Sequence, residues 1–196
     1  MAGTMNLRER KKLATWRAIH TAALRLFDEV GFEATTVEQI AAAANVSRAT
    51  FFNYFAGKEA VVFDQTPEER RHWQALMEDR PADEPLWDSL AAVLTGFCES
   101  LRERIPMQRR LKAQSPALAQ SGQNFGERFF TDLRNWAADR SAATGQDELT
   151  TALSVNLAVA ATHTAYQIWP EDEPFDGFLR RLEECLHQAR PGAATD

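Results

Sequence analysis

Apolar residues recur along most of the chain at steps of three and four, the spacing of one face of an α-helix. The first such run begins at Trp16 and ends before Gly31, a residue type that can close a helix in a left-handed conformation. Its apolar face comprises Trp16, Ile19, Ala23, Leu26, Phe27 and Val30. No segment shows the alternation of apolar and polar residues that is typical of a strand. The pattern therefore predicts an all-α protein of about nine helices.

Two short helices are predicted directly after the first. Thr36 and Gln39 have the spacing of a capping box, in which the threonine caps a helix and the glutamine bonds back to it. This second helix stops at Asn45, because asparagine is the non-glycine residue that best tolerates a positive φ angle. Ser47 then offers a new N-cap to a segment that runs through Phe55. Two short helices joined by about three residues form a candidate helix-turn-helix.

The second of these short helices has one aromatic side and one small, polar side. Phe51 and Phe55 are four residues apart, so both lie on the side that closes a core. The outer side comprises Ala49 and Asn53, flanked by Thr50 and Phe52. This side is almost free of acid and suits a major groove, where asparagine can pair with adenine and an alanine or phenylalanine can contact a thymine methyl group. An ordinary surface helix is the alternative interpretation.

The charge distribution changes along the chain. The net charge is −6, but residues 1–64 carry eight Lys and Arg against seven Asp and Glu, so the excess of acid lies after Asp64. Near the N-terminus only Glu9 offsets a basic cluster. The cluster comprises Arg8, Arg10, Lys11, Lys12 and Arg17. Such a cluster can be a solvated arm, or a phosphate contact where a DNA-reading element follows it.

Composition and length exclude several classes of protein. With 196 residues, 44% hydrophobic and 26% charged, the chain is long enough to bury a core and is typical of globular proteins. The apolar runs are too short for a membrane span, and no signal peptide is visible, so we expect a cytoplasmic protein. Cys98 and Cys185 lack the spacing of metal ligands or redox motifs, which predicts buried thiols and no metal.

The segment "LRLFDEVGFEATTVEQIAAAANVSRATFFNYFAGKEAVV" resembles the TetR family of transcriptional regulators. The landmarks at the family's spacing are Phe27, Gly31, Phe32, Thr36, Ile40, Ala41, Val46, Ser47, Thr50, Tyr54, Phe55 and Lys58. They cover about the first third of the chain. The resemblance implies a dimeric repressor with a C-terminal domain that binds a small inducer. Two residues depart from the family pattern, since Asn45 replaces the usual turn glycine and Phe52 replaces a common tyrosine that would contact phosphate.

The resemblance also implies roles for individual residues. Thr36 is expected to bond a phosphate at the start of the second helix, Tyr54 to reach the DNA backbone, and Lys58 to hold a phosphate at the start of the fourth helix. Arg48, Thr50 and Asn53 are expected to face base edges or adjacent phosphates. The predicted DNA-binding residues are Thr36, Ser47, Arg48, Ala49, Thr50, Phe52, Asn53, Tyr54, Lys58, Arg10, Lys11 and Lys12.

Proline residues mark the predicted starts of the later helices. Thr66 and Pro67 form a start signal of their own, so a helix that begins at Lys58 should kink or break there. The further predicted helices are 85–103, 106–114, 117–143, 147–168 and 173–189. We therefore expect a helix-turn-helix DNA-binding domain with a basic N-terminal arm over residues 1–57. A helical ligand-binding and dimerisation domain should cover residues 58–190, followed by a flexible tail over 191–196.

The C-terminal helices contain more aromatic and sulfur-bearing residues than a plain bundle needs. The predicted ligand-binding residues are Trp73, Met77, Trp87, Phe97, Phe125, Phe129, Trp136 and His163. An inducer cavity would be lined in this way, although most such residues in a bundle are simply core. His163 is the candidate polar contact, with a satisfied buried histidine as the alternative. Arg109, Arg110 and Lys112 would suit a phosphate-bearing ligand such as an acyl-coenzyme A, or form a solvated face.

The last two long helices are the candidates for dimerisation. Small residues among leucines would allow close helix approach over a broad apolar surface, and a four-helix interface across a two-fold axis would bury it. The predicted interface residues are Leu153, Leu157, Ala161, Ala165, Phe178 and Leu182. Packing within one chain is the alternative.

Together these patterns and the family resemblance predict a ligand-responsive transcriptional regulator, most simply a repressor that releases a palindromic DNA operator when a small apolar molecule binds. No catalytic motif is visible, so neither an enzyme nor a cofactor is expected. A transcriptional activator stays an alternative. An architectural DNA-binding protein without a ligand is another, but the acidic balance after Asp64 opposes it. The break at Thr66 and Pro67 is either a rigid spacer or a joint that transmits the ligand signal.

Overall fold

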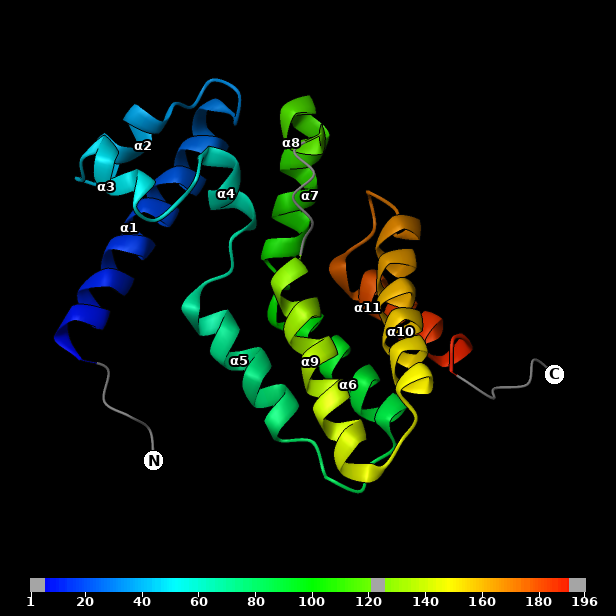
Figure 1. The fold of residues 1–196 in the computed structure, drawn as a ribbon. Helices are drawn as coiled ribbons and strands as arrows, with labels where there is room; N and C mark the ends of the chain where they lie inside the picture. The colour runs from blue at the N-terminus through cyan, green and yellow to red at the C-terminus, as the bar shows by residue number, and fades with distance from the viewer. Residues whose placement is uncertain (1–5, 121–125, 191–196) are drawn as a thin grey trace. The chain divides into compact units, whose positions relative to one another are not determined.

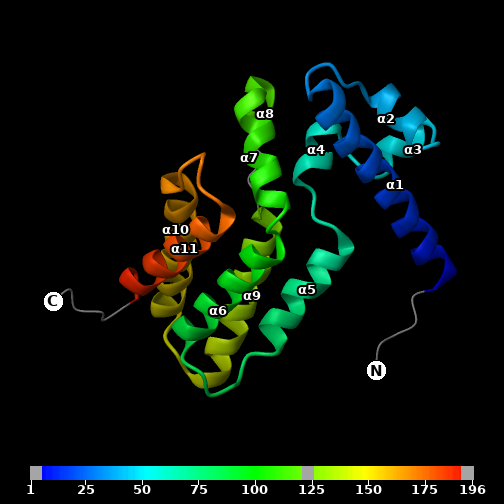
Figure 2. The ribbon, with the colours of Figure 1, turned by 180° about the vertical axis from the view of Figure 1, so that it is seen from behind.

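The computed structural model describes residues 6–120 and 126–190, and its regular structure in these ranges is entirely helical (Figures 1 and 2). The helices of the N-terminal part are α1 (Leu7–Val30), α2 (Val37–Ala43), α3 (Arg48–Phe52) and α4 (Lys58–Phe63). They are followed by α5 (Pro67–Glu78), α6 (Leu86–Ser100), α7 (Arg104–Gln114), α8 (Pro116–Gln120), α9 (Glu127–Thr144), α10 (Glu148–Ile168) and α11 (Phe175–Gln188). The prediction of an all-α fold is confirmed, with eleven helices in the described ranges instead of about nine.

Two compact units make up the described chain. The first contains the residues up to Pro67 and those from Met107 through α8, and the second contains Glu68–Pro106 and the residues from Gly126 onward. One boundary between the units therefore falls inside α7. The expected division into residues 1–57 and 58–190 stays a prediction about domains, and the expected tail of residues 191–196 lies outside the described residues.

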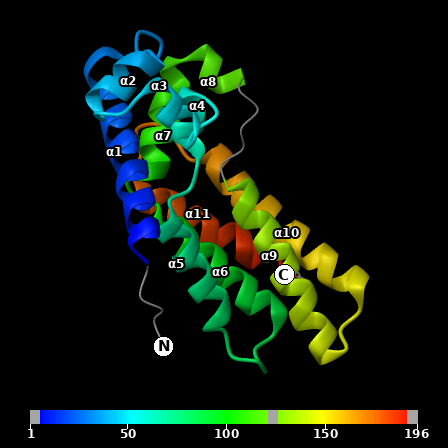
Figure 3. The same cartoon turned by 60° about the vertical axis from the view of Figure 1, so that its left-hand side comes forward.

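The first helix is longer than the hydrophobic pattern predicted, because a second capping box lies before the basic cluster. The Asn6 side-chain oxygen accepts a hydrogen bond from the backbone amide of Glu9 at 2.9 Å, and the Glu9 carboxylate accepts one from the backbone amide of Asn6 at 3.0 Å. The expected basic arm is thus helical from Leu7. In Figure 3 these first turns of α1 extend beyond α2 and α3. Gly31 ends the helix with φ 88° and ψ 157°, a conformation that only glycine adopts readily, and not in the left-handed helical region expected from sequence.

Local capping produces α2 and α3 as the sequence predicted. The Thr36 hydroxyl accepts from the Gln39 amide at 3.2 Å, and the Gln39 side chain accepts from the Thr36 amide at 2.8 Å. Asn45 has a φ of 54°, the one positive value among described residues other than glycine. Ser47 caps α3 by accepting from the Thr50 amide at 3.0 Å. The capping predictions are confirmed, although α3 ends at Phe52 rather than running through Phe55.

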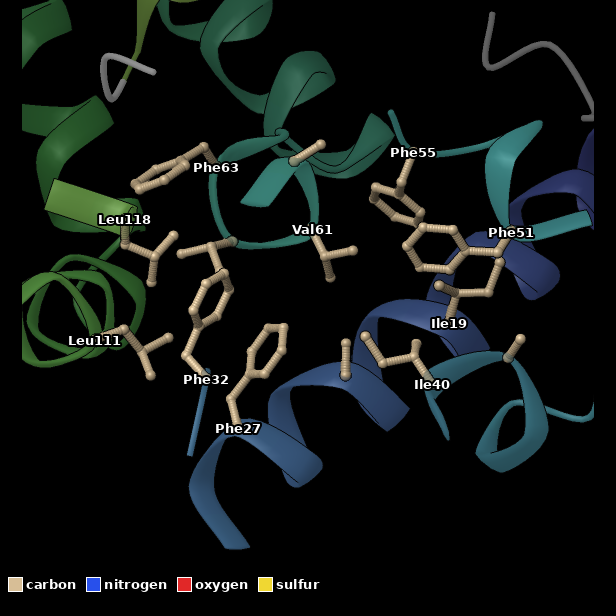
Figure 4. Packing of buried hydrophobic residues seen from close by; sticks show 14 of the residues in the cluster. Ile19, Phe27, Phe32, Ile40, Phe51, Phe55, Val61, Phe63, Leu111 and Leu118 are labelled. Atoms are coloured by element: carbon tan, nitrogen blue, oxygen red, sulfur yellow. The ribbon is translucent and has the colours of Figure 1, made fainter. Parts of the chain in front are cut away.

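One hydrophobic core holds the first unit together, and α7 and α8 contribute to it. Its labelled members in Figure 4 are Ile19, Phe27, Phe32, Ile40, Phe51, Phe55, Val61, Phe63, Leu111 and Leu118. The predicted burial of Phe51 and Phe55 beneath the outer side of α3 is confirmed. Val30, by contrast, is exposed, so the apolar face of α1 is narrower at its end than expected. Leu111 and Leu118 show that this core extends well beyond the predicted helix-turn-helix.

The second unit is built around α10. This helix packs against α11, α9 and α6, and α11 also packs against α6 (Figure 1). Its buried aromatic residues include Trp73 of α5, Phe97 of α6 and Phe129 of α9. The predicted single helix over 117–143 is wrong, because Gly126 has a left-handed φ of 81° and α9 begins only after it. The predicted break before Pro67 is confirmed, since α4 ends at Phe63 and α5 starts at the proline.

Candidate DNA-binding surface and sensing residues

Helix α3 presents the outer side that the sequence predicted. Ala49, Phe52 and Asn53 are exposed, and Phe52 leaves 44% of its surface open. The Phe51 ring beneath them is fully buried, which fixes the rotation of this short helix. Thr50 is half-buried, with its hydroxyl 2.8 Å from the Ser47 hydroxyl. The outer side of α3 therefore combines an amide, an aromatic ring and a methyl group, a chemistry that can contact base edges.

Arg48 is held beside this surface by two contacts. Its guanidinium lies 2.8 Å from a Glu38 carboxylate oxygen on α2 and 5.1 Å from the centroid of the Phe52 ring. Both partners of the ion pair are more than 60% exposed, so the pair is weak and the arginine can exchange Glu38 for a phosphate. Thr36 at the start of α2 is also exposed, and Tyr54 is half-buried. The remaining predicted contacts, Arg10, Lys11 and Lys12, are exposed on the first turns of α1.

Lys58 has partners within the protein that its sequence does not reveal. Its ammonium group donates to the Phe32 carbonyl at 2.8 Å and to the Thr35 carbonyl at 3.0 Å. The same group lies 4.3 Å from the centroid of the Phe32 ring. These contacts tie the start of α4 to the loop that leads into the Thr36 cap. The phosphate contact implied by the family resemblance stays a prediction, and the structure adds a second role that positions α2.

The basic residues of α7 are also engaged within the first unit. Arg110 forms a 2.8 Å ion pair with Asp28 of α1. The Lys112 ammonium lies 4.8 Å from the centroid of the Phe63 ring, and burial lowers the pKa of this lysine. Both side chains contact other helices of the first unit, and neither needs a phosphate-bearing ligand to explain its position.

Most predicted ligand-binding residues pack against one another. The Phe97 and Phe129 rings stack with centroids 3.6 Å apart, and the Trp73 ring lies edge-on to each at 5.7 Å. Met77 and Trp87 are buried as well, and Trp136 is half-buried. Phe125 lies outside the described residues. The structure thus brings Trp73, Phe97 and Phe129 together, in a closed arrangement without a visible space for a ligand among the three rings.

His163 does not point into a buried space. It is exposed on α10, where its ring lies edge-on to Phe130 at 5.4 Å. A separate surface pocket of about 410 Å³ lies between α9 and α10, with Ser141, Thr151 and Asn156 among its lining residues. None of the predicted ligand-binding residues lines this pocket. The sequence offered no signal for it, because its lining residues are ordinary small and polar residues at the ends of two long helices.

The predicted dimer residues divide into two groups. Leu153 and Leu157 of α10 are 53% and 42% exposed, as a surface available to a partner requires. The other four predicted residues, Ala161, Ala165, Phe178 and Leu182, are already buried within one chain. For these four, internal packing explains the apolar pattern. Sequence reasoning missed Leu149 and Ile168, which are 66% and 56% exposed and extend the same apolar stripe along α10.

Across residues 6–120 and 126–190, no helix is both long and apolar enough to cross a membrane. Within the same ranges, no group of three or more His, Cys, Asp or Glu side chains could hold a metal ion.

The comparisons with known proteins point to one family. Residues 19–64 match the model of the bacterial regulatory proteins of the tetR family. The transcriptional regulator MftR of Mycobacterium tuberculosis is 27% identical over 169 residues, which are 84% of each chain. The HTH-type transcriptional regulator TcmR of Streptomyces glaucescens is 44% identical over 97 residues, which are 50% of this chain and 43% of TcmR.

A solved structure agrees with the fold over nearly the whole length. FadR of Thermus thermophilus, a TetR-family transcriptional repressor in complex with lauroyl-CoA, aligns with a TM-score of 0.55 and 24% identity, covering 92% of this chain and 96% of FadR. The matched region, residues 19–64, contains the capped α2, the Asn45 turn and the exposed side of α3. The chain therefore belongs to the tetR family of bacterial regulatory proteins and is a DNA-binding transcriptional regulator with a helix-turn-helix.

Proposed function

We propose that this regulator is a dimeric repressor that releases a palindromic operator when a small molecule binds its second unit. The observation that carries the proposal is the outer side of α3, where Phe52 and Asn53 are exposed above a closed aromatic core. A short helix held this firmly at its cap and its base can enter a major groove without first rearranging. The supporting comparison for ligand control is FadR, whose solved complex contains lauroyl-CoA.

Dimerisation is proposed to use the exposed stripe of α10. Leu149, Leu153 and Leu157 recur every four residues and are 42–66% exposed, and Ile168 continues the stripe at the far end of the helix. Four large apolar side chains on one exposed helix face are costly to leave in water, and pairing with a second copy would bury them. A two-fold dimer in turn implies two half-sites about one helical turn apart, or a small multiple of it.

Release of DNA is proposed to follow from a population shift. A ligand that binds more tightly to a conformation with misplaced recognition helices lowers operator affinity by its difference in affinity for the two states. The chain passes between the two units after Pro67, inside α7 and before Gly126, so α7 is a helix that belongs to both. Gln108 of α7 is 3% exposed and donates to the Val62 carbonyl of α4 at 2.7 Å. A displacement of α7 would therefore be transmitted to α4 through this hydrogen bond.

The DNA-binding part of the proposal is tested by selecting bound sequences from random DNA and then comparing variants on the selected site. We expect Asn53→Ala to weaken the selected site by about 1–3 kcal/mol and random DNA much less, because a base-edge contact is lost. Asn135→Ala, an exposed asparagine on α9, is the matched control and should leave both affinities unchanged. Equal losses on selected and random DNA would show that Asn53 does not read bases.

The dimer is tested by sedimentation. Leu153→Glu places a charge in the exposed α10 stripe and should convert a micromolar dimer to monomer. Val30→Glu, at another exposed apolar residue, is the control and should leave the dimer intact. A wild-type chain that sediments as a monomer at micromolar concentration would contradict the assignment. Small molecules that release the selected DNA from the wild-type dimer would then establish the repressor mechanism, whereas ligand-enhanced binding would favour an activator.

A further inference from the structure

Three side chains of α2 and α3 are in contact with one another on the exposed side of the helix-turn-helix. The Nε atom of Arg48 lies 2.8 Å from a Glu38 carboxylate oxygen, and the guanidinium carbon lies 5.1 Å from the centroid of the Phe52 ring. Arg48 and Phe52 are four residues apart on α3, so both lie on the same side of this helix. Whatever α3 contacts with this side therefore meets the cation and the ring together.

The Phe52 ring is exposed but held in place by the core. It lies edge-on to the Phe51 ring with centroids 5.4 Å apart, and Phe51 itself is fully buried in the core of the first unit (Figure 4). A phenyl ring offers no charge and no hydrogen-bond donor to a phosphate. In a major groove it can contact the methyl group of thymine, the apolar group that the base pairs present there. The ring therefore favours bases over the DNA backbone.

Glu38 restricts what Arg48 can bind. A phosphate at this guanidinium would also approach the Glu38 carboxylate, and the two negative charges would repel each other. Guanine instead presents two neutral acceptors, O6 and N7, with which an arginine can pair bidentately. The ion pair with Glu38 uses Nε, so the terminal nitrogens of the same guanidinium can serve a guanine. Arg48 is also the first residue of α3, and the N-terminal residues of a recognition helix contact base edges.

Because Arg48 and Phe52 lie against each other, the bases that they contact must be neighbours. We propose that Arg48 pairs with a guanine and that Phe52 contacts the methyl group of a thymine in the directly adjacent base pair. Glu38 is a positioning residue that holds the guanidinium beside the ring. Each operator half-site then contains a G·C pair next to a T·A pair. This inference deepens the proposed operator recognition and rests on it.

Changes of one group in the DNA test the contacts without altering the protein. The full chain would be titrated with its selected site, and with the same site carrying uracil for that thymine or 7-deazaguanine for that guanine. Uracil lacks the methyl group, and we expect it to weaken binding about threefold, the effect of burying one such group. 7-Deazaguanine lacks the N7 acceptor, and we expect a loss of about fivefold because half of a bidentate pair is removed.

Variants assign each loss to a residue. Phe52→Ala should bind the thymine and uracil sites equally, and Arg48→Ala should bind the guanine and 7-deazaguanine sites equally. Glu38→Gln should lower the ratio of selected to random affinity about threefold, because an arginine freed from an exposed ion pair can bind any phosphate. Glu29→Gln is the matched control. It removes the same charge from the exposed ion pair with Arg25 on α1 and should leave this ratio unchanged.

Several outcomes would overturn the inference. They are a selected site without adjacent G·C and T·A pairs, wild-type binding that neither base analogue weakens, or variants of Arg48 and Phe52 that stay as sensitive to the analogues as the wild type. A reduced salt slope in Arg48→Ala without an effect of 7-deazaguanine would assign the arginine to phosphate and also refute it. An unchanged ratio in Glu38→Gln would refute the positioning role. If the wild-type chain selects no DNA sequence at all, the proposed function fails together with this inference, whereas a selected site that lacks the base step refutes the inference alone.

Discussion

Lys58 offers the sharpest test of how the DNA-binding unit is organised, because its family role and its contacts in the structure predict different results. The change is Lys58→Met, which keeps the apolar stem and removes the ammonium group. In the structure this group donates to the Phe32 and Thr35 carbonyls at 2.8 and 3.0 Å and lies 4.3 Å from the centre of the Phe32 ring. A phosphate contact would instead use the ammonium only in the DNA complex.

The magnitude follows from these contacts. A hydrogen bond to a charged group contributes about 1.5–3 kcal/mol when buried, and a cation over an aromatic ring about 0.5–1 kcal/mol at exposed sites. Lys58 is half-buried, so water can replace part of the loss, and we expect the free energy of unfolding to fall by about 2 kcal/mol. For a chain of 196 residues this corresponds to a decrease in thermal midpoint of about 4–8 °C.

Two assays together decide the outcome. Urea unfolding followed by circular dichroism measures stability, and operator titration at several salt concentrations measures how many phosphates are neutralised. Each lost phosphate contact should reduce the slope of log affinity against log salt by about 0.9. We expect Lys58→Met to lose stability with little change in slope. Lys12→Met, an exposed lysine of α1, should leave stability unchanged and reduce the slope if it contacts phosphate.

The reverse pattern for Lys58 would contradict this expectation. If its removal reduces the salt slope by about 0.9 and leaves the unfolding free energy unchanged, the ammonium acts on DNA and the carbonyl contacts contribute nothing measurable. A loss of both stability and slope would mean that the ammonium moves between the two partners when DNA binds.

Three further predictions concern the connections within the chain and its thiols. Gln108→Met should destabilise the first unit by about 1–3 kcal/mol in urea unfolding, because the Val62 carbonyl loses its buried side-chain donor, and an unchanged midpoint would contradict this coupling of α7 to α4. Pro67→Ala should change the ratio of operator affinities measured with and without inducer if the break before α5 is a joint, and an unchanged ratio would identify a rigid spacer. Burial raises the pKa of Cys98 to about 12, so only about one in 10,000 of these thiols is ionised at pH 8. Iodoacetamide should therefore alkylate the half-buried Cys185 before Cys98, as followed by mass spectrometry. The opposite order would mean that α6 opens readily.

Family resemblance and local pattern together predicted the DNA-binding surface, and the structure confirms the local helix geometry on which that prediction depends. The outer side of α3 follows from the rotation imposed by Phe51, which the helical period alone predicted. The predicted ligand and dimer residues are partly exposed and partly buried, because an apolar residue at helical spacing can face a core, a cavity or a partner. His163 and Leu153 proved exposed, whereas Phe129 and Leu182 are buried. Periodicity indicates that a residue contacts other apolar groups, but it does not show whether those groups belong to the core, to a ligand or to a partner chain.

The features that follow from the sequence alone are those that depend on a few consecutive residues. The capping of α2 by Thr36 and of α3 by Ser47, the positive φ of Asn45 and the break before Pro67 all arise from contacts within about four residues, where covalent geometry leaves few alternatives.

Contacts between residues far apart in the sequence depend instead on the packing of whole helices. Leu118 joins the core of the first unit, although it lies more than fifty residues beyond α4. Lys58 meets carbonyl groups 23 to 26 residues before it, and Trp73 meets Asp132 at a separation of 59 residues. Contacts of this kind depend on how whole helices pack, and packing selects among many faces that look alike in sequence.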